Sequence, residues 1–325
     1  MAGQFERLYY GAKGALYNKL HFDIFSCRLI RKYAGVGIVK PSDMNNLIKE
    51  ELLSGRPFMA GRFGGFEVFA MQSAEFDDAG KMERAIDFLD KSAGFFPKDV
   101  KLLYRFNELM KDACGEVDAL GCWLVNYEEY YIKKYCKSIK SVSPLMALEP
   151  WNSMSSPWSE ALAGRKVLVI HPFEDTIRKQ YEKRDRLFEN PKLLPDFELK
   201  TLKAVQTSGS ATDDRFGTWF DALQYMCDEC DKIDFDVALI GCGAYGFPLA
   251  AHIKKMGKQA VHLGGVLQIL FGIKGRRWDE SDTHLMYNEN WVYPDRSEIP
   301  SGAKKVENAC YWEADTDGED EEKNG

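Results

Sequence analysis

The sequence predicts an α/β protein, with a doubly wound, mostly parallel, Rossmann-like sheet and an additional helical region at its amino end. Between residues 164 and 275 short apolar runs alternate with helix-like segments, as they do in parallel sheets whose strands are joined by helices. The apolar runs at 237–240 and 259–263 are each followed by a glycine turn, and the helix-like PLAAHIKKMG joins them. These two runs and their connection predict one βαβ unit.

The remaining elements follow in chain order. Residues 1–55 are expected to be largely helical, and FMAGRFGGFEVFAM at 58–71 is typical of a strand, a glycine turn and a helix. Helix is expected again at 81–113, then a short strand and a helix in ALGCWLVNYEEYYIKKY. The stretch 141–158 is rich in Pro and Ser and is expected to be a loop. After it come the strand KVLVIHPF, the helix DTIRKQYEKRDRLF, the strand FELKTLKAV and the helix RFGTWFDALQYMCDECDKI.

Three regions are expected along the chain. A helical region covers 1–55, an α/β domain covers 56–300 with 141–163 as the place for an internal boundary, and an acidic tail covers 301–325. The last 13 residues hold seven acids and one Lys, and we expect this tail to be disordered. The net charge of the whole chain is −7, so the rest is close to neutral, which disfavours nucleic-acid binding.

The sequence also bears on location. It has no apolar run of 18 residues and its beginning does not resemble a signal peptide, so we expect a cytoplasmic protein. Residues 1–40 contain seven basic residues against two acids, and Tyr9, Leu16, Leu20 and Ile24 recur at near-helical spacing. Such an amphipathic element either packs on the body or makes a peripheral contact with the inner face of a membrane.

The eight cysteines are scattered, which favours reduced thiols. Cys227-x-x-Cys230 has no second pair at a zinc-site spacing, so these two are expected to be structural.

An anion site is predicted in the last third of the chain. Residues 237–278 contain no Asp or Glu but six Lys and Arg residues. Within them GCGAYG (241–246) follows an apolar run, and Gly264-Gly265 follows the next one. Glycine turns between strand and helix let backbone N–H groups approach a phosphate, which predicts a nucleotide.

Two alternatives to that ligand remain. GCGAYG matches the dinucleotide pattern G-x-G-x-x-G, but the acid that holds the ribose about 20 residues further on is missing. No acid follows before Asp279, so NAD(P) or FAD binding is disfavoured. The glycines could also serve only to make tight connections.

Two segments together resemble the GT-D-fold glycosyltransferases of bacterial surface-glycan assembly. Gly61-Arg62-Phe63-Gly64-Gly65-Phe66-Glu67 is similar to the family signature R-F-G-D-G-E, and 236–278 is similar to its carboxyl-terminal βαβ unit. The run HLGGxxQxxFGIKGxRW looks like that of capsule and surface-polysaccharide proteins. The resemblance implies a transferase that moves a sugar from a nucleotide-diphosphate sugar to a hydroxyl of a glycan or lipid-linked glycan acceptor.

The resemblance also implies a set of site residues. In the family an Asp-x-Glu pair would hold Mn²⁺ or Mg²⁺, but here Gly65 replaces the Asp and only Glu67 remains. Either basic residues neutralise the diphosphate without a metal, or another acid completes a metal site with Glu67. Arg62 suits bidentate contact with a diphosphate. The expected nucleotide-sugar-binding residues are Gly61, Arg62, Gly64, Gly241, Gly243, Tyr245, Gly246, Gly264, Gly265, Gln268 and Lys274.

Glu67 and His262 are the expected catalytic residues, because each could take the proton of the acceptor hydroxyl. Further candidates for this base are His171, Glu174, Asp213 and Asp214. Lys274, Arg276 and Arg277 either close on the diphosphate or form a solvated basic edge. Two other functions stay open: a non-catalytic nucleotide- or sugar-binding protein that kept the fold, and an atypical NAD(P)-dependent oxidoreductase.

Overall fold

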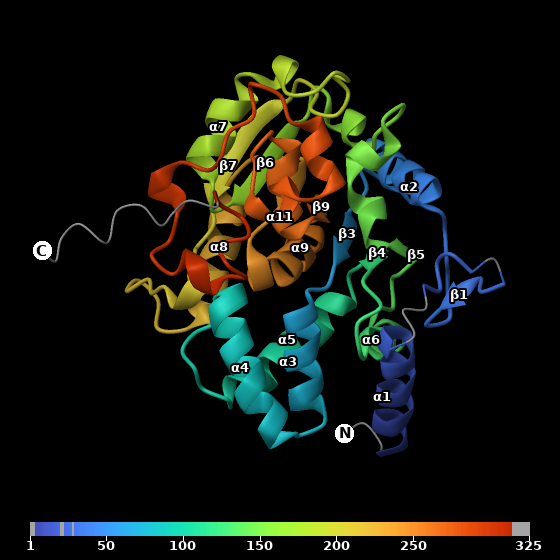
Figure 1. The fold of residues 1–325 in the computed structure, drawn as a ribbon. Coiled ribbons are helices and arrows are strands. Elements are labelled where there is room, and N and C mark those ends of the chain that lie inside the picture. Colours follow the sequence, from blue (N-terminus) through green and yellow to red (C-terminus); the bar gives the residue numbers. More distant parts are fainter. Residues whose placement is uncertain (1–3, 20–22, 28, 314–325) are drawn as a thin grey trace, which may run out of the picture.

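A parallel sheet of seven strands forms the centre of the protein (Figure 1). The computed structural model describes residues 4–19, 23–27 and 29–313. The strand order is β5-β4-β3-β9-β8-β6-β7, and every neighbouring pair is parallel. The strands are β3 (Phe58–Arg62), β4 (Ala119–Cys122), β5 (Ser141–Pro144), β6 (Lys166–His171), β7 (Glu198–Lys203), β8 (Val237–Ile240) and β9 (Gln259–His262). The predicted parallel α/β class is confirmed.

Helices cover both faces of this sheet, so its strands are buried on both sides. Alternate side chains of β6 enter two separate hydrophobic cores, Leu168 and Ile170 in one and Val167 and Val169 in the other. The helices are α1 (Gln4–Lys19), α2 (Pro41–Ser54), α3 (Gly65–Glu75), α4 (Ala79–Ala93), α5 (Leu102–Cys114), α6 (Glu128–Tyr135), α7 (Glu174–Tyr181), α8 (Trp219–Lys232), α9 (Gly246–Lys255), α10 (Leu267–Leu270) and α11 (Arg276–Asp279).

The predicted βαβ unit is formed by β8, α9 and β9. β8 and β9 are adjacent and parallel, with Ile240 opposite His262. β9 also pairs with β3, so the strand that ends at Arg62 lies next to the unit that carries the glycine turns. The sheet order therefore brings the two segments of the sequence motif together.

Two expectations about the first half of the chain need correction. Residues 141–158 are not all loop, because Ser141–Pro144 forms β5 on the edge of the sheet, where Pro144 ends the strand and Val142 is buried. The sheet therefore continues across 141–163 and is not divided there. The helical region 1–55 also contains a small hairpin of β1 (Lys32–Tyr33) and β2 (Val36–Gly37).

The expected tail begins later than residue 301. Residues 301–313 pack on the body and bury Ala303, Val306, Ala309, Cys310 and Trp312. The physical reason is composition: this stretch carries apolar residues, while the run of acids starts only at Glu313. Residues 314–325 lie outside the described residues, as does Leu20 of the predicted amphipathic element.

Two further expectations concern membranes and cysteines. Within the described residues no helix combines the length and apolarity needed to cross a bilayer. All eight cysteines are free thiols. Cys227 and Cys230 lie in α8, where burial raises the pKa of the Cys227 thiol to about 12, as suits a structural rather than a reactive thiol.

Candidate active site at the carboxyl ends of the strands

A large cleft opens where β3 and β9 end. Its empty volume is about 1360 Å³, and we call it the outer cleft. Ligands of open α/β sheets collect at this edge, because loops and helix N-termini converge there. The charged, polar and aromatic side chains that line it and bear on its chemistry are Arg62, Glu67, Arg84, Trp123, His262, Arg277, Glu307 and Tyr311.

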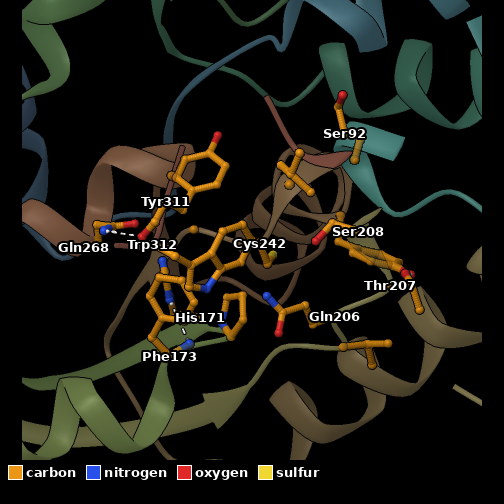
Figure 2. Close-up of a pocket in the computed structure, with 18 residues that line it drawn as sticks. Ser92, His171, Phe173, Gln206, Thr207, Ser208, Cys242, Gln268, Tyr311 and Trp312 are labelled. Carbon is orange, nitrogen blue, oxygen red and sulfur yellow. Dashed lines mark hydrogen bonds between the residues drawn. The ribbon is translucent and has the colours of Figure 1, made fainter. Parts of the chain in front are cut away.

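A second cavity, the inner chamber, adjoins the outer cleft at the ends of β6 and β8 (Figure 2). Its empty volume, with the open solvent at its mouth included, is about 580 Å³, and it shares Gly243, Gly265 and Tyr311 with the outer cleft. Aromatic rings, amides and hydroxyls line it, among them His171, Gln206, Thr207, Tyr245, Gln268 and Trp312. Among the residues that the structure describes, no Asp, Glu, Lys or Arg lines this chamber, so it fits an uncharged part of a ligand.

Arg62, the last residue of β3, carries a positive charge that no carboxylate in the described part of the chain pairs with. Its guanidinium carbon lies 4.6 Å from the centroid of the Trp123 ring. Burial lowers the pKa of Arg62, and Glu149 and Glu67 act on it only from a distance. An arginine stays charged in proteins, and a partly buried charge without a partner is costly. Arg62 therefore favours an anion in the outer cleft.

Two more arginines reach the same cleft. Arg84 of α4 lies at its wall, with its guanidinium carbon 6.0 Å from the centroid of the Phe69 ring. Arg277 of α11 forms an ion pair with Glu307 and donates a hydrogen bond to the Tyr311 hydroxyl at 3.2 Å. Three arginines face two carboxylates, Glu67 and Glu307, in this cleft, and the remaining positive charge suits an anionic ligand such as a diphosphate.

Glu67 lies in the first turn of α3, and its carboxylate folds back over Gly64. A Cβ at Gly64 would collide with that carboxylate, so only glycine leaves it room there. Burial raises the pKa of Glu67, against the opposing effects of its own backbone N–H and Arg62. A carboxylate with a raised pKa is a better proton acceptor than an exposed one.

The described side chains do not form a complete metal site by themselves. Across residues 4–19, 23–27 and 29–313, no group of three His, Cys, Asp or Glu side chains is placed to hold an ion. Gly65 offers no carboxylate beside Glu67, and Mn²⁺ and Mg²⁺ need several oxygen ligands.

His262, at the end of β9, is buried with its ring against Gly246. Its Nδ1 has no hydrogen-bond partner in the described part of the chain, and burial with the nearby Arg62 lowers the pKa of His262 to about 3. Such a histidine stays neutral and is a weak base near neutral pH. These findings argue against the expectation that His262 is the catalytic base.

His171 has the same limitation. Its Nδ1 accepts a hydrogen bond from the Phe173 N–H at 3.0 Å, and burial lowers its pKa to about 3. The other base candidates lie elsewhere: Glu174 contacts Arg178 and Thr201, and Asp213 pairs with Arg215. Asp214 is exposed and lines neither cavity.

The structure brings most of the predicted binding residues together. Arg62, Gly64, Gly243, Gly264 and Gly265 line the outer cleft, and the inner chamber is lined by Gly241, Gly243, Tyr245, Gly265 and Gln268. Tyr245 is already stacked on Trp219, with centroids 4.7 Å apart, so it forms a wall. Gln268 donates hydrogen bonds to the Lys274 and Tyr311 carbonyls and so holds the local backbone.

Three predicted residues line neither cavity. Gly61 packs inside against His262 and Phe247, and Gly246 supports the His262 ring. The Lys274 ammonium lies 5.5 Å from the Tyr287 ring centroid and 5.6 Å from that of Tyr293. These three lie outside both cavities, and their part in ligand binding stays a prediction.

Several lining residues were missed from sequence, namely Arg84, Trp123, Gln206, Glu307, Tyr311 and Trp312. They come from α4, from the loop after β4, from the loop after β7 and from the segment assigned to the tail. No local motif marks them, because only the tertiary fold carries them to the cleft.

The end of β9 also bears on the dinucleotide alternative. A dinucleotide fold places its ribose-binding acid at the end of this next strand. Here the strand ends at His262, which Leu263 and Gly264 follow. The site therefore lacks the group that NAD recognition uses.

Comparisons with known proteins give similarity at the level of fold. No protein family model matches the sequence, and no curated protein matches it. One solved structure, described as the highly conserved domain of unknown function 1792 with a distinct glycosyltransferase fold, has 14% identity and a TM-score of 0.44 and covers 82% of this chain and 93% of its own. Another, described as a new glycosyltransferase from Streptococcus sanguinis, has 12% identity and a TM-score of 0.41, over 81% of this chain and 96% of its own. In the arrangement of its elements, and in nothing finer, the chain is similar to these glycosyltransferase-fold domains.

Proposed function

We propose that this protein is a glycosyltransferase that moves a sugar from a nucleotide-diphosphate sugar to a hydroxyl of a glycan acceptor. The main support for the proposal is the positive charge of Arg62 in the outer cleft, with which no carboxylate of the described residues forms an ion pair. Most residues of the 61–67 segment, and one or more glycines from each of the two glycine turns, line this cleft, and the sequence resemblance rests on these segments.

The donor would occupy both cavities. Its diphosphate would lie in the outer cleft against Arg62, Arg84 and Arg277, beside the Gly264-Gly265 turn. Its nucleoside would enter the inner chamber, whose described lining residues include no charged side chain. In this placement the charged diphosphate faces arginines, and the uncharged nucleoside faces uncharged side chains.

The chemical step needs a proton acceptor and a stabilised leaving group. The acceptor oxygen forms a bond to the anomeric carbon, and the bond from that carbon to the diphosphate oxygen breaks. The negative charge that develops on the nucleoside diphosphate would be stabilised by the three arginines. Glu67 would take the proton of the acceptor hydroxyl, because its pKa is raised while that of His262 is lowered to about 3.

We propose further that the arginines replace the metal that the resemblance implied. Within the described residues Glu67 belongs to no group of three potential metal ligands, whereas three arginines line the same cleft. Nucleotide-sugar binding and turnover should therefore survive chelation of divalent ions.

A second candidate is a nucleotide- or sugar-binding protein without turnover. Gly65 in place of the family's Asp, together with two histidines of lowered pKa, favours it. Turnover distinguishes the two candidates.

The test is release of nucleoside diphosphate from UDP-, GDP- and dTDP-sugars, and of CMP from CMP-sugars, each with a glycan acceptor and with Mn²⁺ or EDTA. We expect one nucleotide class to react, equally in EDTA, and Glu67→Gln to lose about 100-fold or more in rate. Binding of a nucleotide without release of product would instead select the second candidate. Reaction in Mn²⁺ alone would disprove the arginine proposal.

A further inference from the structure

The outward face of α1 is apolar. Phe5, Leu8, Tyr9 and Leu16 are exposed by 79%, 66%, 47% and 53%. At 3.6 residues per turn these positions, with Ala12, fall in one stripe about 100° wide. A stripe of this kind usually faces a protein core, but here it faces outward.

The opposite face of α1 fixes the helix in this orientation. Tyr10 packs edge-on against Tyr130 of α6, with ring centroids 5.4 Å apart. Arg7 and Lys13 form ion pairs with Asp78 at 2.7 Å and with Glu129 at 2.6 Å. Because these contacts hold one face of α1 against the body, the apolar stripe on the other face points outward.

The region around α1 is basic in an otherwise acidic chain. Residues 1–40 carry seven basic residues and two acids, while the whole chain has a net charge of −7. Arg31, Lys32 and Lys40 are exposed, and no carboxylate within the described part of the chain forms an ion pair with them. The hairpin that carries Lys32 is attached to α6, as α1 is, through the Tyr33 hydroxyl and Glu128. Figure 1 draws α1, α6 and this hairpin on the same side of the molecule.

We propose that the α1 face docks on the surface of an anionic lipid bilayer. The apolar stripe would enter the boundary between headgroups and acyl chains, and the exposed cations would contact the anionic headgroups. α1 has 16 residues, fewer than the roughly 20 that a spanning helix needs, so it would lie in the plane of the surface. An apolar stripe beside unpaired cations fits this occupant better than a second copy of an acidic chain.

The outer cleft also extends towards α1, on the side of the helix that packs against Tyr127. A groove lined by Gly11 of α1, Lys81, Asn126 and Tyr127 shares Gly65, Phe69 and Val125 with the outer cleft. On the proposed transferase function, on which this step rests, the groove would lead the sugar end of a lipid-linked acceptor from the bilayer to Glu67. Membrane docking itself does not depend on that function.

The test is co-sedimentation of the full-length protein with vesicles of phosphatidylcholine alone and with one third phosphatidylglycerol. We expect binding to the anionic vesicles that weakens with salt, and a loss of roughly tenfold or more for Leu8→Glu. Leu285→Glu is the matched control, because Leu285 is 74% exposed but lies in the 3₁₀ turn Asp282–Met286. It should bind as the unmodified protein does. The pair Arg31→Glu and Lys32→Glu should weaken binding to anionic vesicles.

Three results would overturn the proposal: no binding to either vesicle, equal losses for Leu8→Glu and Leu285→Glu, or a Leu8→Glu protein that only loses self-association in solution. Thermal melting confirms that each variant folds. Nucleotide binding by Leu8→Glu should stay unchanged, since α1 lies outside the outer cleft. Vesicle binding without any nucleotide binding by the unmodified protein would reject the transferase proposal and leave membrane docking intact.

Discussion

The guanidinium of Arg62 lies over the ring of Trp123, and its carbon is 4.6 Å from the ring centroid. Among the residues that the structure describes, no carboxylate forms an ion pair with it. An aromatic face holds a guanidinium by attraction to its π electrons but leaves its N–H donors free. Arg62 comes from β3 and Trp123 from the residue after β4, the neighbouring parallel strand. The ends of two adjacent strands thus place the Arg62 guanidinium with its N–H groups available to an anion.

Trp123 should therefore contribute to nucleotide affinity without touching the phosphates. We expect Trp123→Leu to weaken nucleoside-diphosphate binding roughly fivefold, by the loss of about 1 kcal/mol of cation–π attraction. Trp123→Phe keeps an aromatic face and should lose less. Calorimetric titration of both variants measures this, and equal affinities for Leu and Phe would reject a role for the ring.

Glu307 should compete with the ligand for Arg277. The two form an ion pair at the edge of the outer cleft, and a bound diphosphate would have to share Arg277 or displace Glu307. Because a partly exposed pair contributes up to about 1 kcal/mol, Glu307→Gln should raise nucleotide affinity by about two- to fivefold. A weaker affinity in the same titration would mean that Glu307 contacts the ligand directly.

Two glycines should respond differently to alanine. At Gly64 the new Cβ meets the end of the flexible Glu67 side chain, which can rotate away. Gly64→Ala should thus change the free energy of unfolding by about 1 kcal/mol or less but cut turnover at least about tenfold, by moving the base.

Gly246→Ala is the contrasting variant. Its Cβ meets the buried ring of His262, which has no room to move. It should lower the free energy of unfolding by about 1–3 kcal/mol, despite alanine's better helix propensity. Denaturant unfolding and the turnover assay separate the two cases, and equal turnover of Gly64→Ala and the unmodified protein would remove Glu67 from the mechanism.

Stability should fall in mild acid because of the buried histidines. The pKa of both His171 and His262 is lowered to about 3 in the folded protein, against about 6.5 in the unfolded chain. The unfolded state takes up these protons first, so the free energy of unfolding drops as pH falls below about 6.5 and continues to drop towards pH 3. At pH 5 each histidine would account for about 2 kcal/mol.

His262→Gln is the check on this pH dependence. Its unfolding free energy should vary less steeply between pH 6.5 and 5 than that of the unmodified protein, whatever its absolute stability. An unchanged slope would mean that His262 is not held neutral by burial.

The sheet could be predicted from sequence because its strands are apolar and its turns carry glycine. β6, β8 and β9 are buried on both faces, so KVLVIH, VALI and QAVH stand out as apolar runs. β5 could not be found this way. It is a four-residue edge strand that ends in Pro144, and its sequence SVSP is that of a loop.

The candidate site could be predicted where its residues lie in a local motif. Arg62 and the glycine turns stand at strand ends, and Glu67 stands in the first turn of the helix that follows β3. Trp123, Arg84 and Tyr311 reach the cleft only through tertiary packing. Tyr311 also lies in 301–325, which was expected to be a disordered tail because of the acidic residues that follow it. Lys274 was expected at the phosphate because of its basic surroundings, but its ammonium lies beside the rings of Tyr287 and Tyr293, which the sequence does not indicate.

The measurement that tests the central claim most directly is titration of the nucleoside diphosphates into Arg62→Ala and Lys274→Ala, in EDTA. Both variants remove one positive charge from the chain, but only Arg62 lines the outer cleft. We predict that Arg62→Ala loses affinity roughly tenfold or more, as expected for a hydrogen-bonded charge, while Lys274→Ala binds as the unmodified protein does. Equal affinities for the two variants would contradict the placement of the diphosphate and, with it, the proposed transferase site.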